Sequence, residues 1–325
     1  MLTQLWIDTD VGVDDAQGIM LAATHPAVRI VGISTVHGNT TLDNVDANVR
    51  RVLAACGCTS VLLARGAAEP LLCDRTWVVG TAYHGSDGMG DAADTAPTRA
   101  DVESMGDWVH HPAGVAAAAI VDAARECGGR LTLLALGPLT NVALAVKLCP
   151  ELPSMVERLI VMGGAHGPGN VSPHAEFNFH CDPEAAKIVL QKFPSTLLVP
   201  RDVGMAFPLP WAAFEDVQKG DNMRARFFAS ISRSVIESAK AQLGGMYHER
   251  GFTTHDPQAV GIAIAPHLMT ASRHVYCDIE VQGSHLTRGM SVFDDESHLG
   301  RASNVQLVTG IDVDGLMAEF RRALS

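Results

Sequence analysis

The chain has 325 residues, of which 47% are hydrophobic and 18% charged, and its formal net charge at neutral pH is −12. A chain this long and this apolar can bury a large core, which excludes a disordered polypeptide. Nucleic acids and anionic membranes bind basic faces, so the acidic balance disfavours both and favours a small neutral or cationic ligand.

Short β-branched or leucine-rich runs alternate along the chain with segments of helical apolar spacing. The expected strands cover residues 5–8, 28–36, 60–64, 131–136, 158–164, 196–200 and 274–281, and helical patterns cover 14–26, 42–57 and 112–129. Alternating strands and helices predict an α/β fold with a mostly parallel central sheet flanked by helices. Since no linker or internal repeat interrupts the pattern, we expect a single domain over residues 1–325.

Polar side chains follow four of these strands. Asp8 to Asp15 follow the first, Asn39 the second, the turn from Leu136 to Asn141 the fourth, and Gly163 opens the segment after the fifth. Because ligands of such sheets lie beyond the carboxyl ends of the strands, we expect a site at this rim. The Gly-rich stretches 84–103 and 242–251 are the candidates for mobile loops over it.

The seven cysteines are odd in number and scattered, which predicts reduced thiols rather than a disulfide scaffold. The first residues have no basic start and no long apolar stretch, so we expect no cleavable signal. The longest apolar run, from Val115, is too short to cross a bilayer. A soluble, cytoplasmic protein is the expectation.

The stretch IDTDVGVDDAQGI, residues 7–19, holds four aspartates: Asp8, Asp10, Asp14 and Asp15. Like charges this close raise one another's pKa unless a cation neutralises them. A helix N-cap would explain one of these acids, but a strand leaving a core has no reason to carry Asp8 and Asp10. Hard oxygen ligands without Cys or paired His favour Ca²⁺ or Mg²⁺, and ligands spread over a loop suit Ca²⁺.

Two later segments carry further polar groups. In residues 253–266, Asp256 before Pro257 is typical of a helix start, but it could also reach a cation, and His255 could supply a proton near neutral pH. In residues 163–186, Asn170, Glu176 and Asn178 are hydrogen-bonding groups suited to a hydroxyl-rich ligand such as a sugar. A merely solvated polar loop is the alternative for the second segment.

Taken together, these stretches resemble the inosine-uridine preferring nucleoside hydrolase family. The family's amino-terminal pattern, Asp-X-Asp-Pro-Gly-X-Asp-Asp-Ala-X-Ala, is matched here by residues 8–18, with Val11 in place of the proline. The resemblance continues, in the family's order, through residues 36–53, 84–90, 134–145, 161–186 and 255–260. It implies a Rossmann-like nucleoside hydrolase fold and hydrolysis of the N-glycosidic bond of purine or pyrimidine ribonucleosides in nucleoside salvage, by a homodimer or homotetramer.

The resemblance also implies a role for each site residue. The family's single Ca²⁺ would be held by Asp10, Asp15, the carbonyl of Leu136 and Asp256. The residues implied to contact the ribose are Asp14, Asn39, Met162, Asn170, Glu176 and Asn178. The residues implied to surround the base are His84, Phe177, Tyr247 and His255. Asp10 would deprotonate the water that attacks the anomeric carbon, and His255 would protonate the departing base.

Two rival functions remain open from the sequence. The residues DTDV also resemble the nucleophile loop of haloacid-dehalogenase-type Mg²⁺ phosphohydrolases, in which Asp8 would attack phosphorus, but no convincing strand-end lysine or distal acidic pair follows. The other rival is a non-catalytic nucleoside- or ribose-binding protein on the same scaffold. A protein that only binds nucleosides would need neither the general base, Asp10, nor the general acid, His255. The sequence leaves the preferred base undecided.

Overall fold

A computed structural model describes residues 2–72, 81–105, 108–111, 115–242 and 250–325. Eight strands form the main sheet in the order β3-β2-β1-β4-β5-β6-β10-β7. The strands are β1 (Thr3–Thr9), β2 (Val28–Thr35), β3 (Leu63–Ala64), β4 (Leu131–Ala135), β5 (Val156–Met162), β6 (Thr196–Val199), β7 (Met269–Val275) and β10 (Val305–Ile311). All pairings in this sheet are parallel except that of β7 with β10.

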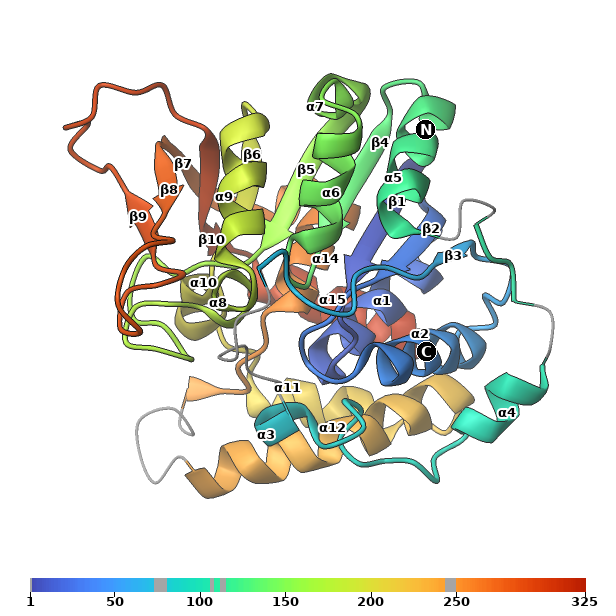
Figure 1. Ribbon diagram of the computed structural model, residues 1–325. Helices are drawn as coiled ribbons and strands as arrows, with labels where there is room; N and C mark the ends of the chain where they lie inside the picture. The colour runs from blue at the N-terminus through green and yellow to red at the C-terminus, as the bar shows by residue number, and fades with distance from the viewer. Residues whose placement is uncertain (1, 73–80, 106–107, 112–114, 243–249) are drawn as a thin grey trace.

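Helices cover both faces of the sheet, as the α/β prediction requires. On one face α5 (Ala116–Cys127), α6 (Thr140–Leu148) and α9 (Pro183–Lys192) lie side by side (Figure 1). On the other face α1 (Val13–Thr24), α14 (Asp256–Ile264) and α15 (Val313–Leu324) contact one another, and α2 (Leu42–Ala55) and α12 (Met223–Gln242) also contact α1.

The remaining helices are short. They are α3 (Thr81–His84), α4 (Arg99–Ser104), α7 (Leu152–Met155), α8 (Phe177–Cys181), α10 (Arg201–Ala206), α11 (Trp211–Asp216) and the 3₁₀ turns η1 (Val217–Lys219) and η2 (Pro266–Leu268). Among the residues that the structure describes, no helix is both long and apolar enough to span a membrane.

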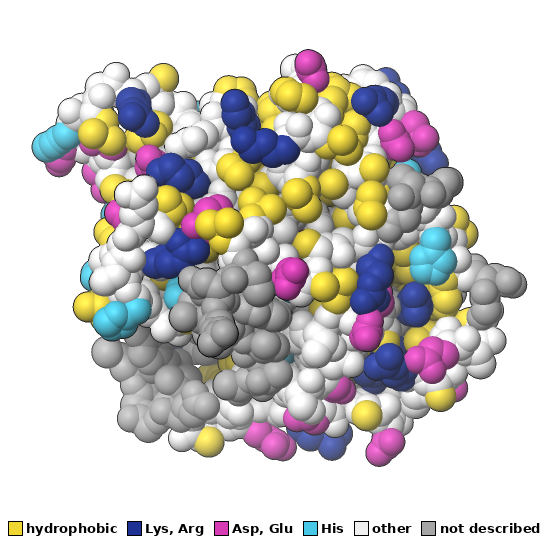
Figure 2. Space-filling model, viewed as in Figure 1, with side chains coloured by type: hydrophobic (Ala, Val, Ile, Leu, Met, Phe, Trp, Pro, Cys, Tyr) yellow, Lys and Arg dark blue, Asp and Glu magenta, His cyan; other side chains and the backbone are white. Residues whose placement is uncertain are grey.

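The central strands are buried on both sides, which explains their near-continuous apolar runs. Leu5 and Ile7 of β1 join the core cluster under α1, α14 and α15, whereas Trp6 between them joins the cluster under α5, α6 and α9. This alternation is the two-residue period of a strand covered on each face. The outer side of α6 exposes Leu144 and Leu148, and Figure 2 shows hydrophobic side chains gathered over this part of the molecule.

The sheet differs from the sequence prediction at its carboxyl-terminal end. The expected strand 274–281 is split: β7 ends at Val275, and β8 (Cys277–Ile279) pairs with β9 (Ser291–Phe293) in a separate antiparallel ribbon. The prediction also missed β10, which lies between β6 and β7. Of the expected strand 60–64, only Leu63 and Ala64 pair in the sheet.

The strand order predicts a ligand crevice next to β1. From β1 the chain builds outward through β2 and β3, then returns to the other side of β1 with β4, β5 and β6. The carboxyl ends of β1 and β4 therefore lie at the point where the winding direction reverses, and loops leaving such neighbours diverge and leave a hollow. Asp10 and Leu136 follow these two strands.

Candidate active site

Three carboxylates meet at the start of α1 and α14. Oxygens of Asp14, Asp15 and Asp256 lie within 4.8 Å of one another, and all three side chains are buried. Helix α1 begins directly after β1, and α14 packs along it, so the two helix starts bring residues far apart in sequence together. Both helix N-termini favour negative charge, but three acids exceed what two helix ends neutralise.

Asp10 lies beside this cluster and is incompletely satisfied. Its Oδ2 accepts the backbone N–H of Asn39 at 2.9 Å, whereas its buried Oδ1 has no hydrogen-bond donor among the described residues. Burial, and then the charge of Asp15, raises the pKa of Asp10 well above its usual range. An acceptor left without a donor is costly in a protein interior, which makes Oδ1 a ready ligand for a cation.

Asp15 is held in place by three donors. The Thr9 hydroxyl donates to its Oδ1 at 2.5 Å, and the Gly12 N–H and the Asn39 amide donate to its Oδ2 at 2.9 and 3.1 Å. Even so, burial and the charge of Asp14 raise the pKa of Asp15, and burial with the three neighbouring acids raises that of Asp256. The donors orient the carboxylates without cancelling their charge.

The turn that carries the Leu136 carbonyl lies beside Asp10. The N–H of Leu136 donates to the carbonyl of Asp8 at 2.8 Å, and its carbonyl oxygen accepts the Asn178 amide at 2.7 Å. A Cβ at Gly137 would lie 2.8 Å from Oδ1 of Asp10, so this turn lies directly against the unsatisfied carboxylate oxygen. The donor set of carboxylate and carbonyl oxygens fits a hard cation.

Asp8 has a different environment from the other acids of its motif. The Ser34 hydroxyl and the Asn141 amide, at 2.8 Å, both donate to its Oδ1. Burial raises the pKa of Asp8 to about 7. The backbone carbonyl of Asp8 accepts the N–H of Leu136, so Asp8 holds the Leu136 turn from within the sheet.

The predicted ribose contacts come from loops, helix starts and one strand end: Asp14 lies in α1, Met162 ends β5 and Asn178 lies in α8. Asn178 donates to the carbonyls of both Leu136 and Met162, which leaves its amide oxygen available. Glu176 caps α8, and its carboxylate accepts the N–H groups of Gly164, Asn178 and Phe179. Burial raises the pKa of Glu176 to about 7. Asn170 is exposed.

The two histidines predicted to contact the base differ in the hydrogen bonding of Nδ1. Nδ1 of His84 accepts the Val13 N–H at 3.0 Å, which leaves the ring proton of the neutral form on Nε2. His255 precedes α14, and its buried Nδ1 has no hydrogen-bond partner among the described residues. Burial lowers the pKa of His255 to about 4. Phe177 is half-buried at the start of α8, and Tyr247 lies outside the described residues.

The stretch 84–103, expected as a loop, is closely hydrogen-bonded where it follows α3. Asn48 of α2 donates to the carbonyls of both Val11 and Asp87, and the buried guanidinium of Arg51 donates to the carbonyls of Pro97, Ala92 and Thr95. These contacts fasten the segment after His84 to the loop that carries Asp10. The sequence did not predict these roles of Asn48 and Arg51, because polar residues at their positions are ordinary in an amphipathic helix.

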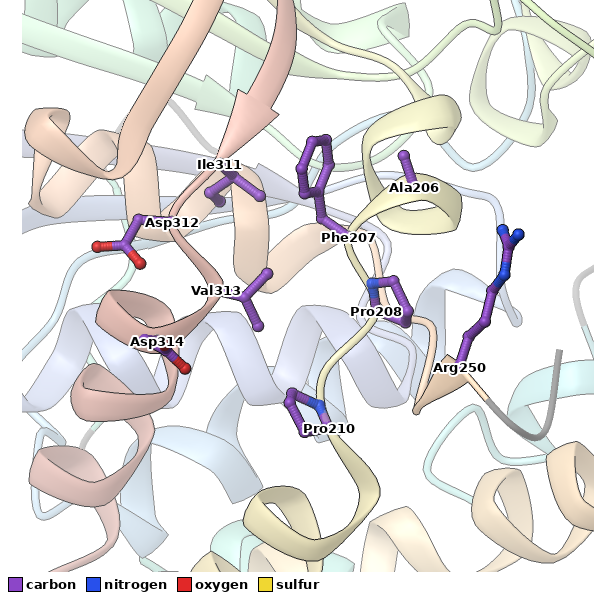
Figure 3. A pocket seen from close by; sticks show the side chains of 9 residues that line it. All are labelled: Ala206, Phe207, Pro208, Pro210, Arg250, Ile311, Asp312, Val313 and Asp314. Carbon is purple, nitrogen blue, oxygen red and sulfur yellow. The ribbon is translucent and has the colours of Figure 1, made fainter.

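A separate hollow of about 690 Å³ lies where the connection from α10 to α11 passes the start of α15 (Figure 3). It is lined by residues 206–208, Pro210, Arg250 and 311–314, none of which is a predicted site residue. Asp312, in its wall, already caps α15 by accepting the Gly315 N–H. The acidic cluster, not this hollow, is therefore the candidate centre.

Comparison with known proteins agrees with the geometry. Residues 5–318 match the model of the family described as inosine-uridine preferring nucleoside hydrolase. The chain is 32% identical to the pyrimidine-specific ribonucleoside hydrolase RihA of Enterobacter sp. (strain 638), with 98% of this chain and 96% of that protein aligned. It is 31% identical to the non-specific ribonucleoside hydrolase RihC of Escherichia coli O1:K1, over 97% of this chain and 96% of that protein.

Solved structures have the same fold. An inosine-guanosine nucleoside hydrolase superimposes with a TM-score of 0.86 at 29% identity, covering 100% of this chain and 99% of that one. A purine-preferring ribonucleoside hydrolase from Gardnerella vaginalis gives a TM-score of 0.85 at 25% identity, covering 99% of this chain and 98% of that one. The chain therefore belongs to the inosine-uridine preferring nucleoside hydrolase family, whose members are ribonucleoside hydrolases.

Proposed function

We propose that this enzyme hydrolyses the N-glycosidic bond of purine or pyrimidine ribonucleosides to free base and ribose, in a Ca²⁺-dependent reaction of nucleoside salvage. The observation that carries the proposal is the buried acidic cluster at the crevice beside β1, with the donorless Oδ1 of Asp10 next to it. The relatives differ in the bases named for them, so the proposal covers both classes of base.

The ligands we propose for Ca²⁺ are Asp10, Asp15, the carbonyl of Leu136 and Asp256. All four offer oxygen, and neither cysteine nor histidine joins them, which favours Ca²⁺ or Mg²⁺ over zinc. Asp14, the third member of the measured cluster, is near enough to bind the ion as well as the ribose. When bound, Ca²⁺ supplies positive charge that offsets the acids and polarises water and ribose hydroxyls.

In the reaction Asp10 acts as the general base. Its Asn39 contact fixes the carboxylate through Oδ2, which keeps a second lone pair for the proton of the attacking water, while the donorless Oδ1 is the proposed ligand of the ion. Asp10 would take the proton of a water that an ion held by this cluster would make more acidic, next to the anomeric carbon of a bound ribose.

The departing base requires a proton or a donor, and we assign this role to His255. Burial lowers its pKa, so the ring is neutral at pH 7 before substrate binds. As negative charge develops on the departing base, the ring would take up a proton from solvent and pass it to a nitrogen of the base, which returns the imidazole to its neutral form. The Nε2 proton of His84 offers a second donor.

The remaining substrate contacts keep their predicted roles. For the ribose we propose Asp14, Asn39, Met162, Asn170, Glu176 and Asn178, and for the base His84, Phe177, Tyr247 and His255. The homo-oligomeric state and the cytoplasmic location also stay predictions. Asp8 lies within strand β1, and its Oδ1 accepts hydrogen bonds from Ser34 and Asn141, so we assign it a supporting role rather than that of the nucleophile of the rival phosphohydrolase.

The direct test is release of reducing sugar from inosine, guanosine, adenosine, uridine and cytidine, with and without Ca²⁺. We expect ribose release from at least one nucleoside, reversible loss with a chelator, and recovery on addition of Ca²⁺. Hydrolysis of a chromogenic phosphate ester with Mg²⁺ would support the rival phosphohydrolase. Tight nucleoside binding without any ribose release would support the rival binding protein.

The role of His255 has its own test. His255→Ala should lower turnover of natural nucleosides by about 10²-fold or more, yet spare p-nitrophenyl riboside, whose leaving group needs no proton. Equal losses on the two substrates would instead assign His255 a structural role.

A further inference from the structure

The imidazole of His255 lies against the backbone of α10 at Gly204. A Cβ built on Gly204 would be 2.3 Å from Nδ1 of His255, 2.7 Å from its Cε1 and 2.5 Å from the carbonyl oxygen of Thr254. Heavy atoms that are not bonded do not approach this closely, so no larger residue fits at 204 without displacing the ring. We propose that Gly204 is a positioning residue that sets the orientation of His255 toward the departing base.

Packing is what holds the ring on this side. The buried Nδ1 of His255 has no hydrogen-bond partner among the described residues, and the side chain makes no cap hydrogen bond to α14. His84 differs, because the N–H of Val13 fixes its ring. With no hydrogen bond at Nδ1, the α10 backbone is the surface that sets where the imidazole lies.

Helix α10 is firmly placed for this role. The Arg201 N–H donates to the carbonyl of Gly164 at 3.0 Å, and the carboxylate of Asp202 accepts the N–H groups of His166 and Gly167 at 2.7 and 2.8 Å. These bonds tie the helix to the turn after β5. Because α10 is fixed to this turn, it keeps the His255 ring in one position relative to the acidic cluster.

The presence of glycine here is itself informative. Glycine inside a helix costs about 1 kcal/mol relative to alanine, since it gives up more backbone freedom on folding. Gly204 has no positive φ that would require glycine. The close approach of His255 and Thr254 is the remaining reason for it, and the ring it admits is the proposed general acid.

This inference depends on the proposed function, and its test uses two substrates. In the Gly204→Ala variant we expect kcat/KM for uridine or inosine to fall at least tenfold, while p-nitrophenyl riboside loses less than about threefold. Gly261→Ala in α14 is the matched control, because its Cβ would meet only the side-chain ends of Leu316 and Leu268. That control should leave the ratio of the two substrates unchanged.

A double variant separates the possible failures. If Gly204 acts through the ring, Gly204→Ala in a His255→Ala background should leave the substrate ratio as His255→Ala alone sets it. A changed ratio in His255→Ala with a normal ratio in Gly204→Ala would overturn this inference and leave the proposed function standing. An unchanged ratio in His255→Ala would overturn the proposed role of His255, on which this inference depends.

Thermal unfolding keeps the test decisive if Gly204→Ala folds poorly. Removing the imidazole takes away the closest of the clashes, so Gly204→Ala should lower the Tm less in the His255→Ala background than in the wild type. An equal fall in both backgrounds would show that the Thr254 carbonyl, 2.5 Å from the added Cβ, and not the ring limits the residue at 204, and the inference would fail.

Discussion

Asp10→Asn separates the catalytic and metal-binding roles of this side chain with little disturbance of the fold. The amide oxygen of asparagine can accept the Asn39 N–H as Oδ2 does now, and the NH₂ group falls at Oδ1, where no donor lies among the described residues. Asp15→Asn would be less informative, because three donors already point at that carboxylate.

We expect Asp10→Asn to lower turnover but not the unfolding temperature of the metal-free protein. Turnover should fall by about 10²- to 10⁴-fold, the range for loss of a general base. The metal-free protein should unfold at the same or a higher temperature, because the substitution removes a buried charge that Asp15 and Asp14 repel. Ca²⁺ should stabilise the variant less than the wild type.

The size of the metal effect follows from the chain length. Unfolding entropy of about 2.1 cal/mol/K per residue gives roughly 0.7 kcal/mol/K for 325 residues. Ca²⁺ at about 100 times its Kd stabilises the folded state by about 2.7 kcal/mol, which corresponds to about 4 °C in Tm. Thermal unfolding with chelator and with Ca²⁺, for both proteins, measures the difference.

Two results would refute this reasoning. Substantial ribose release by Asp10→Asn would exclude Asp10 as the general base. A Ca²⁺-induced rise in Tm as large in the variant as in the wild type would exclude Asp10 as a ligand of the ion, whatever happened to turnover.

Two further substitutions test the frame of the site. Arg51→Met leaves one buried and two partly buried carbonyls without their guanidinium donor. It should cost about 3 kcal/mol, or about 4 °C in Tm, measured by calorimetry; an unchanged Tm would contradict it. Burial lowers the pKa of His37 from 6.5 to about 4, so the unfolded chain binds a proton that the folded one does not, and stability falls as the pH drops from 6.5 to 4. His37→Gln should remove roughly 3 kcal/mol of this loss, seen as a smaller fall in urea midpoint; parallel curves for the two proteins would refute it.

The sequence predicts the parallel part of the fold well because buried parallel strands leave unbroken apolar runs. Residues 131–136 were expected as a strand, and β4 covers Leu131–Ala135. The antiparallel edge was harder. Residues 274–281 contain two strands with a break at Tyr276, and no glycine or proline marks that break. Strand β10 was not predicted, because its sequence, VQLVTGI, interrupts the apolar pattern with polar residues.

The site was predictable to the extent that its residues follow strand ends. Asp10, Asn39 and Leu136 do, and the winding reversal at β1 and β4 brings them to one crevice. The contacts that hold them could not be read from local pattern. Asn48 joins the loops of Val11 and Asp87, which lie 37 residues before it and 39 residues after it, and Gly204 meets His255 from a different helix. Such pairs depend on three-dimensional packing, which residue spacing does not encode.

The four acids of the first motif show how burial and donors divide structural from chemical roles. Asp8 and Asp10 are equally buried and two residues apart, on a strand and just beyond it. Asp8 receives two side-chain donors at one oxygen, while Asp10 receives a single backbone donor and faces three other carboxylates. Each donor added around Asp10 would stabilise its charge within the protein and weaken its need for a cation. Asp8 also has one buried oxygen without a donor among the described residues, so the property that suits Asp10 to bind an ion and to take a proton is this shortage together with the three carboxylates that it faces.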